Sequence, residues 1–159
     1  MENKKVKIVN MTNGPISVKI PAASFQREWM SHGASVNVDS DKLEEMMYDI
    51  GFKYMIDTGM LYIEDMDVKI NLGIEPEGAT APVNVIVLSE ADKKRYMTAM
   101  PIKEFKIQIA KLNREQLSLL CDYAIANKYT DFEKAKALKE HTGRDIIQTI
   151  RLSEQNKED

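Results

Sequence analysis

The sequence predicts an α+β fold, with a small β-rich N-terminal module followed by a C-terminal module of about four to five short helices. Apolar and polar residues alternate at a period of two in the first part of the chain, as in half-buried strands, and recur at helical spacing beyond residue 89. Glycines and prolines cluster between these two parts. We therefore expect a β-rich module with short helices over residues 1–72, a linker and docking strand over 73–88, and a helical module with a polar C-terminal tail over 89–159.

The alternating pattern begins at residues 6–20, where it predicts a β-hairpin. Asn13-Gly14-Pro15 in the middle of this stretch is a turn signal. Residues 25–29 and 35–38 have the composition of two further short strands. The polar sequence Ser31-His32-Gly33 between them is expected to form a turn.

A helical insert is predicted after these strands. Four apolar residues lie at i, i+3, i+4 and i+7, which is one face of a helix: Leu43, Met46, Met47 and Ile50. Asp41 is expected to cap the start of this helix and Gly51 to end it. Residues 52–57 can add one or two helical turns, the apolar run 60–63 is expected to close the sheet as a strand, and residues 64–72 have a mixed helical pattern.

The main boundary is expected where Gly73, Pro76, Gly78 and Pro82 fall within ten residues. Residues 83–88 that follow are apolar and rich in β-branched side chains. This composition fits a buried strand and fits equally well a segment that docks on the sheet of the first module.

Cap residues divide the C-terminal module into successive helices. Ser89 and Asp92 form a capping-box pattern, and Pro101 stands where the next helix has its first residue. Asn113 is expected to cap a third helix. Thr130-Asp-Phe-Glu133 is expected to cap a fourth, which ends at Thr142-Gly143. A last short helix uses Ile146, Ile147 and Ile150, and we expect the polar tail over 153–159 to be frayed.

Composition limits the classes of function. The formal net charge is −3 and the sequence pI about 5.5, so the chain lacks the cationic excess typical of proteins that bind nucleic acid. One cysteine permits no intramolecular disulfide. We expect no signal peptide and no membrane anchor, because the N-terminus runs straight into a strand-like segment and no apolar run reaches the roughly 18 residues of a membrane helix.

Residues that bear chemistry are few, and we expect no catalytic residue, no cofactor and no metal. Cys121 lies within an apolar helical stripe, which favours a core position over a nucleophile. His32 and His141 have no second ligand at metal-binding spacing. The acidic cluster Glu64, Asp65 and Asp67 lacks the glycine and the further ligands of a calcium loop, and fits the start of a helix.

The last two predicted helices also fit a helix-turn-helix motif. They flank the turn at Thr142-Gly143, close to four basic residues: Lys136, Lys139, Arg144 and Arg151. Residues 101–159 carry 11 Lys and Arg against 10 Asp and Glu, so the excess of positive charge is small. DNA binding is therefore an alternative and not the main expectation.

Ten methionines are the unusual feature of the composition. Flexible thioethers fill irregular cores and also line adaptable protein-binding surfaces, and both readings stay open. On the second reading we expect a partner-binding surface on the β-rich module, formed by Phe25, Arg27, Trp29, Met30, Met60 and Tyr62. Exposed strand edges at residues 5–9 or 25–29 are expected to be able to pair with a strand of a partner.

Scattered positions along nearly the whole chain carry a resemblance to a class of proteins. In the first module they are Val6-Lys-Ile-Val-Asn10, Gly14, Ile20-Pro21, Arg27-Glu-Trp29, Gly33, Leu43-Glu-Glu, Tyr48-Asp49, Gly51 and Gly59-Met-Leu-Tyr-Ile-Glu-Asp65. In the remainder they are Leu72-Gly73, Pro82-Val83-Asn84, Val87-Leu88, Arg95-Tyr96 and Asp122-Tyr-Ala-Ile125. With these residues the chain resembles small accessory or structural proteins of tailed bacteriophages and prophages.

The resemblance implies a phage setting and no active site. By analogy with that setting we expect a non-enzymatic protein that acts through protein–protein contacts, as a virion (head or neck) component or an assembly factor. Its expected partners are phage structural proteins or further copies of itself, with no membrane and no small-molecule substrate. Its expected location is the host cytoplasm during infection, with incorporation into the virion. The alternative is a phage regulator that binds a host protein or nucleic acid through the C-terminal helical module.

Overall fold

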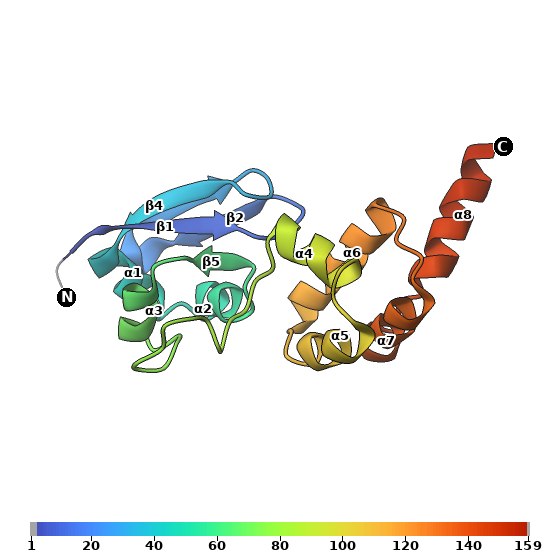
Figure 1. Cartoon of the computed structure of the whole chain (residues 1–159). Coiled ribbons are helices and arrows are strands. Elements are labelled where there is room, and N and C mark those ends of the chain that lie inside the picture. Colours follow the sequence, from blue (N-terminus) through green and yellow to red (C-terminus); the bar gives the residue numbers. More distant parts are fainter. Residues whose placement is uncertain (1–2, 159) are drawn as a thin grey trace. The chain divides into compact units, whose positions relative to one another are not determined.

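The α+β fold is confirmed by a computed structural model, which describes residues 3–158. The chain forms two compact units, Met1–Val87 and Leu88–Asp159. The first contains all five strands of the described chain and the helices α1–α3, and the second contains α4–α8 (Figure 1).

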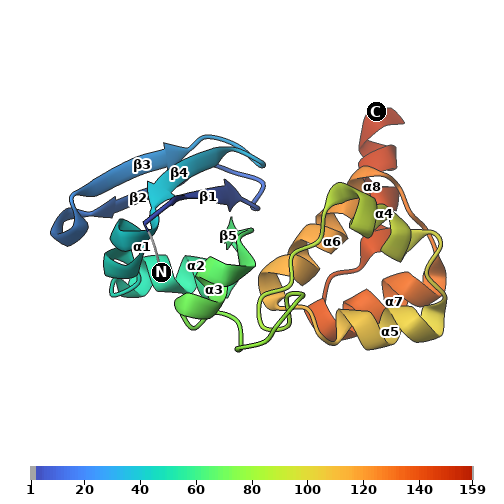
Figure 2. The same cartoon turned by 60° about the vertical axis from the view of Figure 1, so that its left-hand side comes forward.

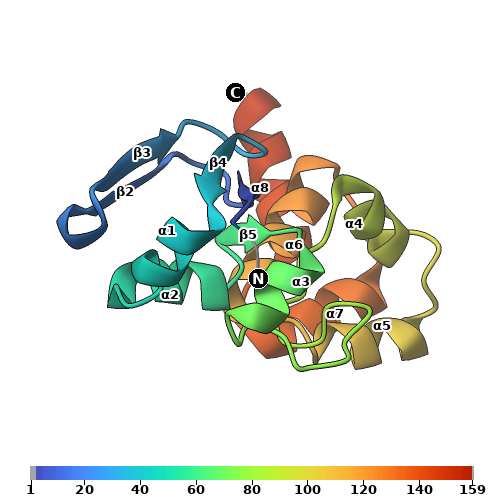
Figure 3. The ribbon, with the colours of Figure 1, turned by 90° about the vertical axis from the view of Figure 1, so that its left-hand side faces the viewer.

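Two small antiparallel sheets make up the β structure of unit 1. One is three-stranded, in the order β4 (Ser35–Asp39), β1 (Lys5–Asn10) and β5 (Leu61–Ile63). The other pairs β2 (Ile16–Ile20) with β3 (Phe25–Trp29), which are joined by the 3-10 turn η1 (Pro21–Ala23). Figure 3 shows β2 and β3 as a separate two-stranded ribbon.

The predicted hairpin over residues 6–20 is wrong, because its two strands belong to different sheets. β1 pairs with β4 and β5, and β2 pairs with β3. The physical reason lies in Asn10, whose fully buried side chain closes the connecting loop. Its Nδ2 donates to the Gly14 carbonyl (2.8 Å) and its Oδ1 accepts from the Thr12 N–H (2.8 Å). The loop therefore folds around this side chain instead of making a tight hairpin turn.

Three short helices come after β4, with β5 between the second and the third, and they lie on one side of the strands (Figure 2). They are α1 (Ser40–Met46), α2 (Ile50–Asp57) and α3 (Met66–Asn71). The predicted helix through Ile50 is wrong in its caps and in its end. Asp39 precedes α1, the chain turns at residues 47–49, and Asp49 caps α2 by accepting the Phe52 N–H (2.9 Å), so Gly51 lies inside a helix.

Residues 73–87, from the segment 73–88 that was expected to be a linker and docking strand, pack on unit 1. Ile74 and Val85 are both buried within its hydrophobic core. Of the two possibilities that the sequence allows for residues 83–88, the strand does not form, and the burial of Val85 in the core of unit 1 fits the docked segment. Instead the backbone N–H groups of residues 83–85 donate to the buried carboxylate of Glu75, which satisfies them without a neighbouring strand.

Unit 2 consists of five helices in the described chain: α4 (Glu90–Met97), α5 (Ile102–Ile109), α6 (Arg114–Ala126), α7 (Phe132–Thr142) and α8 (Ile146–Glu158). The capping box of Ser89 and Asp92 is confirmed, as is the cap of α6 by Asn113. Pro101 is the cap of α5 rather than its first residue, and Asp131 replaces Thr130 as the cap of α7.

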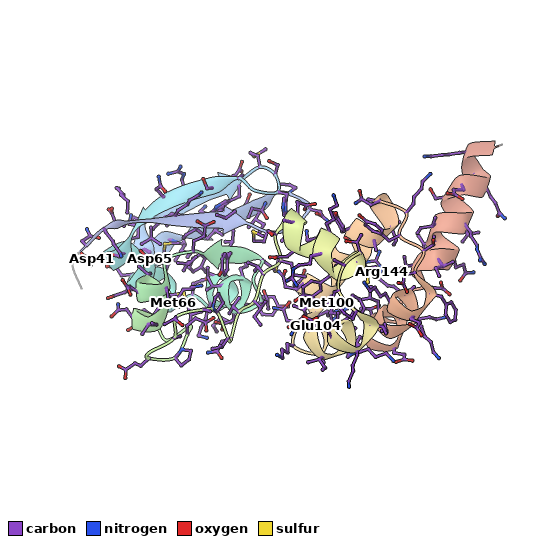
Figure 4. All side chains as sticks on the ribbon, viewed as in Figure 1. Asp41, Asp65, Met66, Met100, Glu104 and Arg144 are labelled. Atoms are coloured by element: carbon purple, nitrogen blue, oxygen red, sulfur yellow. The ribbon has the colours of Figure 1, made fainter. Side chains whose placement is uncertain are left out.

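The last helix is longer than the sequence predicts. α8 is bound to the rest of unit 2 near its start, where Ile146 and Ile150 are buried and Arg144 bridges to α6 (Figure 4). Arg144 Nη2 lies 2.8 Å from Asp122 Oδ1, and its Nη1 donates to the Ser118 carbonyl (3.3 Å). The tail expected to be frayed continues this helix to Glu158, exposed on all sides through residue 157.

Candidate protein interaction surfaces

Two of the three aromatic residues predicted to meet a partner, Phe25 and Trp29, lie in the core of unit 1. Trp29 is 0% exposed and donates its Nε1–H to the Ile8 carbonyl (2.9 Å). Phe25 is also buried, with its ring centroid 6.4 Å from that of Trp29. Burial of such large apolar surfaces stabilises the fold, and it removes both side chains from any surface that a partner meets.

The other four predicted residues form no common apolar patch. Arg27 and Met30 are exposed, whereas Met60 and Tyr62 are half-buried. The Tyr62 hydroxyl accepts from Lys69 Nζ (2.9 Å), so that side chain serves to satisfy a buried ammonium group. The structure therefore separates residues that the sequence placed on one surface.

One of the two predicted strand edges is wrong. Residues 5–9 belong to β1, the central strand of its sheet, whose two edges are occupied by β4 and β5. β3 is paired with β2 alone within the described chain. A small groove of about 240 Å³ runs beside it, where Arg27 and residues 37–39 of β4 contribute mainly polar lining.

A different apolar patch is exposed on unit 1, at the start of α2. Tyr48 is 90% exposed, Ile50 is 87% exposed and Tyr54 is 58% exposed. Ile50 and Tyr54 lie at i and i+4, on the same face of the helix. Exposed apolar residues are common singly, but aromatic and aliphatic side chains gathered within seven residues are typical of interaction surfaces. We call these three residues the α2 patch.

The α2 patch was missed because Ile50 continues the spacing of the helical stripe that begins at Leu43. In one continuous helix that position faces the core, as Leu43 and Met46 do. The break at residues 47–49 starts a new helix and turns Ile50 outward. The signal for the break was Asp49, an aspartate three residues before Phe52, which is the position of an N-cap.

Charge around the α2 patch is mainly negative. Glu45, Asp49 and Asp57 lie within a few residues of it in the sequence, against the single cation Lys53. Lys53 is itself paired with Asp57 across one helical turn (2.5 Å). Glu45 and Asp49 thus leave an excess of negative charge beside the exposed apolar groups.

A second candidate surface lies on unit 2, in a cleft of about 800 Å³ between α7 and α8. Its apolar lining is Phe132, Ala135 and Ile147, and Phe132 is 70% exposed. Its charged lining is Lys136, Lys139, Glu140, Asp145 and Arg151. Cavities of roughly 300–1,000 Å³ that combine apolar walls with a few polar groups are typical of binding sites.

The cleft carries an excess of positive charge. Lys139 Nζ is 3.2 Å from Asp145 Oδ2, so these two charges balance each other. Of the remaining charged residues in the lining, Lys136 and Arg151 are positive and Glu140 is negative, which leaves one net positive charge. The basic residues noted beside the predicted helix-turn-helix are thus divided: three line the cleft, and Arg144 is engaged by α6.

The remaining residues considered for catalysis or metal binding serve the fold. Cys121 is buried, as predicted, and burial raises the pKa of its thiol, which disfavours the reactive thiolate. Asp65 caps α3, as expected for a carboxylate at a helix start, and its ion pair with Lys4 (2.7 Å) lowers the pKa of the carboxyl (Figure 4). Over residues 3–158, no group of three or more His, Cys, Asp or Glu side chains is arranged to hold a metal ion.

Comparison of the chain with protein-family models, with curated proteins and with solved structures finds no match. None of the helices in the described part of the chain is both long and apolar enough to span a membrane.

Proposed function

We propose that this chain is a non-enzymatic bacteriophage protein that acts through protein–protein contacts, as a virion component of the head or neck or as an assembly factor. The observation that carries the proposal is the α2 patch, which exposes an isoleucine and two tyrosines to solvent. Tyrosine at such positions combines a large apolar ring with a hydroxyl that bonds at the edge of an interface.

Two further observations support a binding role. The chain's one cysteine is buried with a raised pKa, so it does not supply an activated nucleophile. The resemblance of the sequence to phage accessory proteins supports the setting, by analogy. On this proposal the protein works in the host cytoplasm during infection and is carried into the particle by phage structural partners.

Mass spectrometry of density-purified virions, with this chain quantified against the major capsid protein, tests the proposal. We expect a fixed ratio of the two proteins in particles that carry the wild-type chain. Ile50→Lys places a charge in the α2 patch and is expected to reduce incorporation at least tenfold. Val83→Lys is the matched control, because Val83 is 58% exposed on the same unit and lies outside the patch.

The possible results separate the roles. Loss of the chain from Ile50→Lys particles, with normal amounts in Val83→Lys particles, supports a contact made by the patch. Wild-type protein that is absent from virions but required for particle yield identifies an assembly factor. Wild-type protein that is absent from virions and dispensable for particle yield contradicts both roles.

The cationic α7–α8 cleft favours a second candidate function, a regulator that binds a host protein or nucleic acid through the helical unit. Binding to DNA predicts an affinity that falls steeply as salt rises, since cations on the protein displace counterions from phosphates. Duplex binding at low salt, lost in Arg151→Glu, supports this alternative. Wild-type protein that binds no duplex at low salt contradicts its nucleic-acid form.

A further inference from the structure

We propose that the α7–α8 cleft of one copy binds the α2 patch of a second copy, so that the protein assembles head to tail. This inference rests on the proposed function, because it assigns a partner to the same patch. Its occupant is a second copy of this chain, because the two surfaces match in shape and are opposite in charge.

The two surfaces have complementary shapes, since one is a projecting helix face and the other is a groove between two helices. The α2 patch is a helix face on which Ile50 and Tyr54 project at i and i+4. The cleft is a hollow between two helices, with Ala135 and Ile147 in its lining and Phe132 beside them. A helix that places apolar side chains at this spacing into a groove between helices is a recurrent mode of recognition.

Both surfaces expose large apolar side chains, so covering either surface is energetically favourable. Ile50 is 87% exposed and Phe132 is 70% exposed. Burial of apolar area stabilises association by about 25 cal/mol per Å² before its costs are counted. Contact between the two surfaces removes both side chains from water in one step.

The charges of the two surfaces are opposite. Glu45 and Asp49 beside the patch leave negative charge, whereas Lys136 and Arg151 give the cleft its positive excess. The same asymmetry holds for the whole units. Residues 1–87 carry 8 Lys and Arg against 13 Asp and Glu, and residues 88–159 carry 14 against 12. Complementary charge speeds encounter and fixes orientation, which favours a second copy of this chain as the occupant.

The symmetry of such a contact has a consequence. The patch and the cleft are different surfaces, so each contact uses the patch of one copy and the cleft of another. A contact of this kind is heterologous and continues into a ring or an open chain. The proposal therefore predicts a closed ring of two or more copies, or an open chain, in which every contact joins a patch to a cleft.

Sedimentation velocity over a range of protein concentrations tests the proposal on the full chain. We expect the wild-type protein to self-associate as concentration rises, and to do so less at high salt because the charges are screened. Ile50→Lys, which damages the patch, and Arg151→Glu, which damages the cleft, are each expected to be monomeric. Ile107→Lys is the matched control, since Ile107 is 54% exposed on α5 and lies outside both surfaces.

A mixture of the two defective variants gives the sharpest result. Ile50→Lys retains its cleft and Arg151→Glu retains its patch, so together they can make one contact and no more. We expect a 1:1 heterodimer that does not grow with concentration. Circular dichroism of each variant checks that the fold is kept, and all three substituted side chains are exposed in the described structure.

Failure of this inference is distinguishable from failure of the proposed function. A wild-type protein that stays monomeric overturns the inference, and patch-dependent incorporation into virions then still supports the function. A dimer that is lost in Ile50→Lys but kept in Arg151→Glu indicates a patch-to-patch contact and also overturns it. Head-to-tail assembly of a protein that is absent from virions and dispensable for particle yield supports the inference and contradicts the function.

Discussion

Glu75 shows how one buried residue can hold a loop that has no regular structure. Its side chain is almost fully buried and its two carboxylate oxygens accept from the N–H groups of Val83, Asn84 and Val85 at 3.0–3.2 Å. Burial favours the neutral acid, but the backbone donors together outweigh it and hold the pKa of Glu75 below its usual value. The carboxylate thus replaces the neighbouring strand that residues 83–85 lack.

Glu75→Gln is expected to lower the free energy of unfolding at pH 7 by about 1–3 kcal/mol, because hydrogen bonds to a charged acceptor are stronger than those to an amide and the amide nitrogen cannot accept. Chemical denaturation followed by circular dichroism measures the difference. Glu77→Gln is a suitable control, since Glu77 is exposed on the same loop.

Acid should reduce the stabilisation that comes from Glu75. Its pKa is lower in the folded than in the unfolded chain, so the unfolded chain takes up a proton first as pH falls. The contribution is therefore complete above the unfolded pKa of about 4.5 and is lost as pH falls through the lower folded value. The difference between wild type and Glu75→Gln should shrink over this range; a difference that is constant from pH 7 to pH 3 contradicts the assignment.

At the scale of elements, the turn between α7 and α8 depends on backbone conformation. Gly143 ends α7 with φ of 77°, and its N–H donates to the Lys139 carbonyl (2.8 Å). A Cβ at this position meets no atom within 4 Å, so a substitution there tests the left-handed backbone and not packing. The turn matters for the proposed assembly, because it joins the two helices whose residues line the cleft.

Gly143→Ala is expected to lower the free energy of unfolding by about 1–2 kcal/mol, the cost of a left-handed conformation for a residue with a Cβ. Gly14→Ala is the matched control, because Gly14 also has open space around it and its φ is not positive. Thermal unfolding of the full chain, followed by circular dichroism, compares the two variants with the wild type. Equal stability of both variants contradicts the role given to the turn.

The elements that could be predicted from the sequence are those fixed by contacts within about four residues. The capping box at Ser89, the cap at Asn113 and the helix end at Gly143 all act over one turn, and each is present. The pairing of β1 depends instead on β4 and β5, which lie some 25 to 55 residues further along the chain. A periodic pattern identifies a strand but contains no information on which strand it will meet.

The candidate surfaces were harder to predict for the same reason. In a sequence, an apolar residue of the core cannot be told from an apolar residue of an exposed patch. The sequence therefore wrongly predicts Trp29 on a partner surface and Ile50 on the core face of a helix. The difference between them comes from tertiary structure. Trp29 is enclosed by the hydrophobic core to which both sheets contribute, whereas the three-residue break between α1 and α2 turns Ile50 outward. Only the cap at Asp49 marked that break locally.

At the scale of the whole molecule, unit 1 contains a hydrophobic core of its own. The cluster of buried residues that joins its two sheets and helices extends from Val6 to Val85, entirely within Met1–Val87. We therefore expect a fragment of residues 1–87 to fold without unit 2. On folding, a chain of this length buries more than roughly 60% of the surface that it exposes when unfolded, which is sufficient for a stable domain.

Trp29 makes this prediction measurable, because it is the one tryptophan in the sequence and is 0% exposed in the core of unit 1. The fragment should have the blue-shifted emission of a buried indole and lose it in a single cooperative transition with denaturant. Emission at the wavelength of a solvated indole, with no transition, contradicts an independent unit 1. A folded fragment carries the α2 patch without the cleft, so on the head-to-tail proposal it should bind the full-length chain and block further growth instead of extending it.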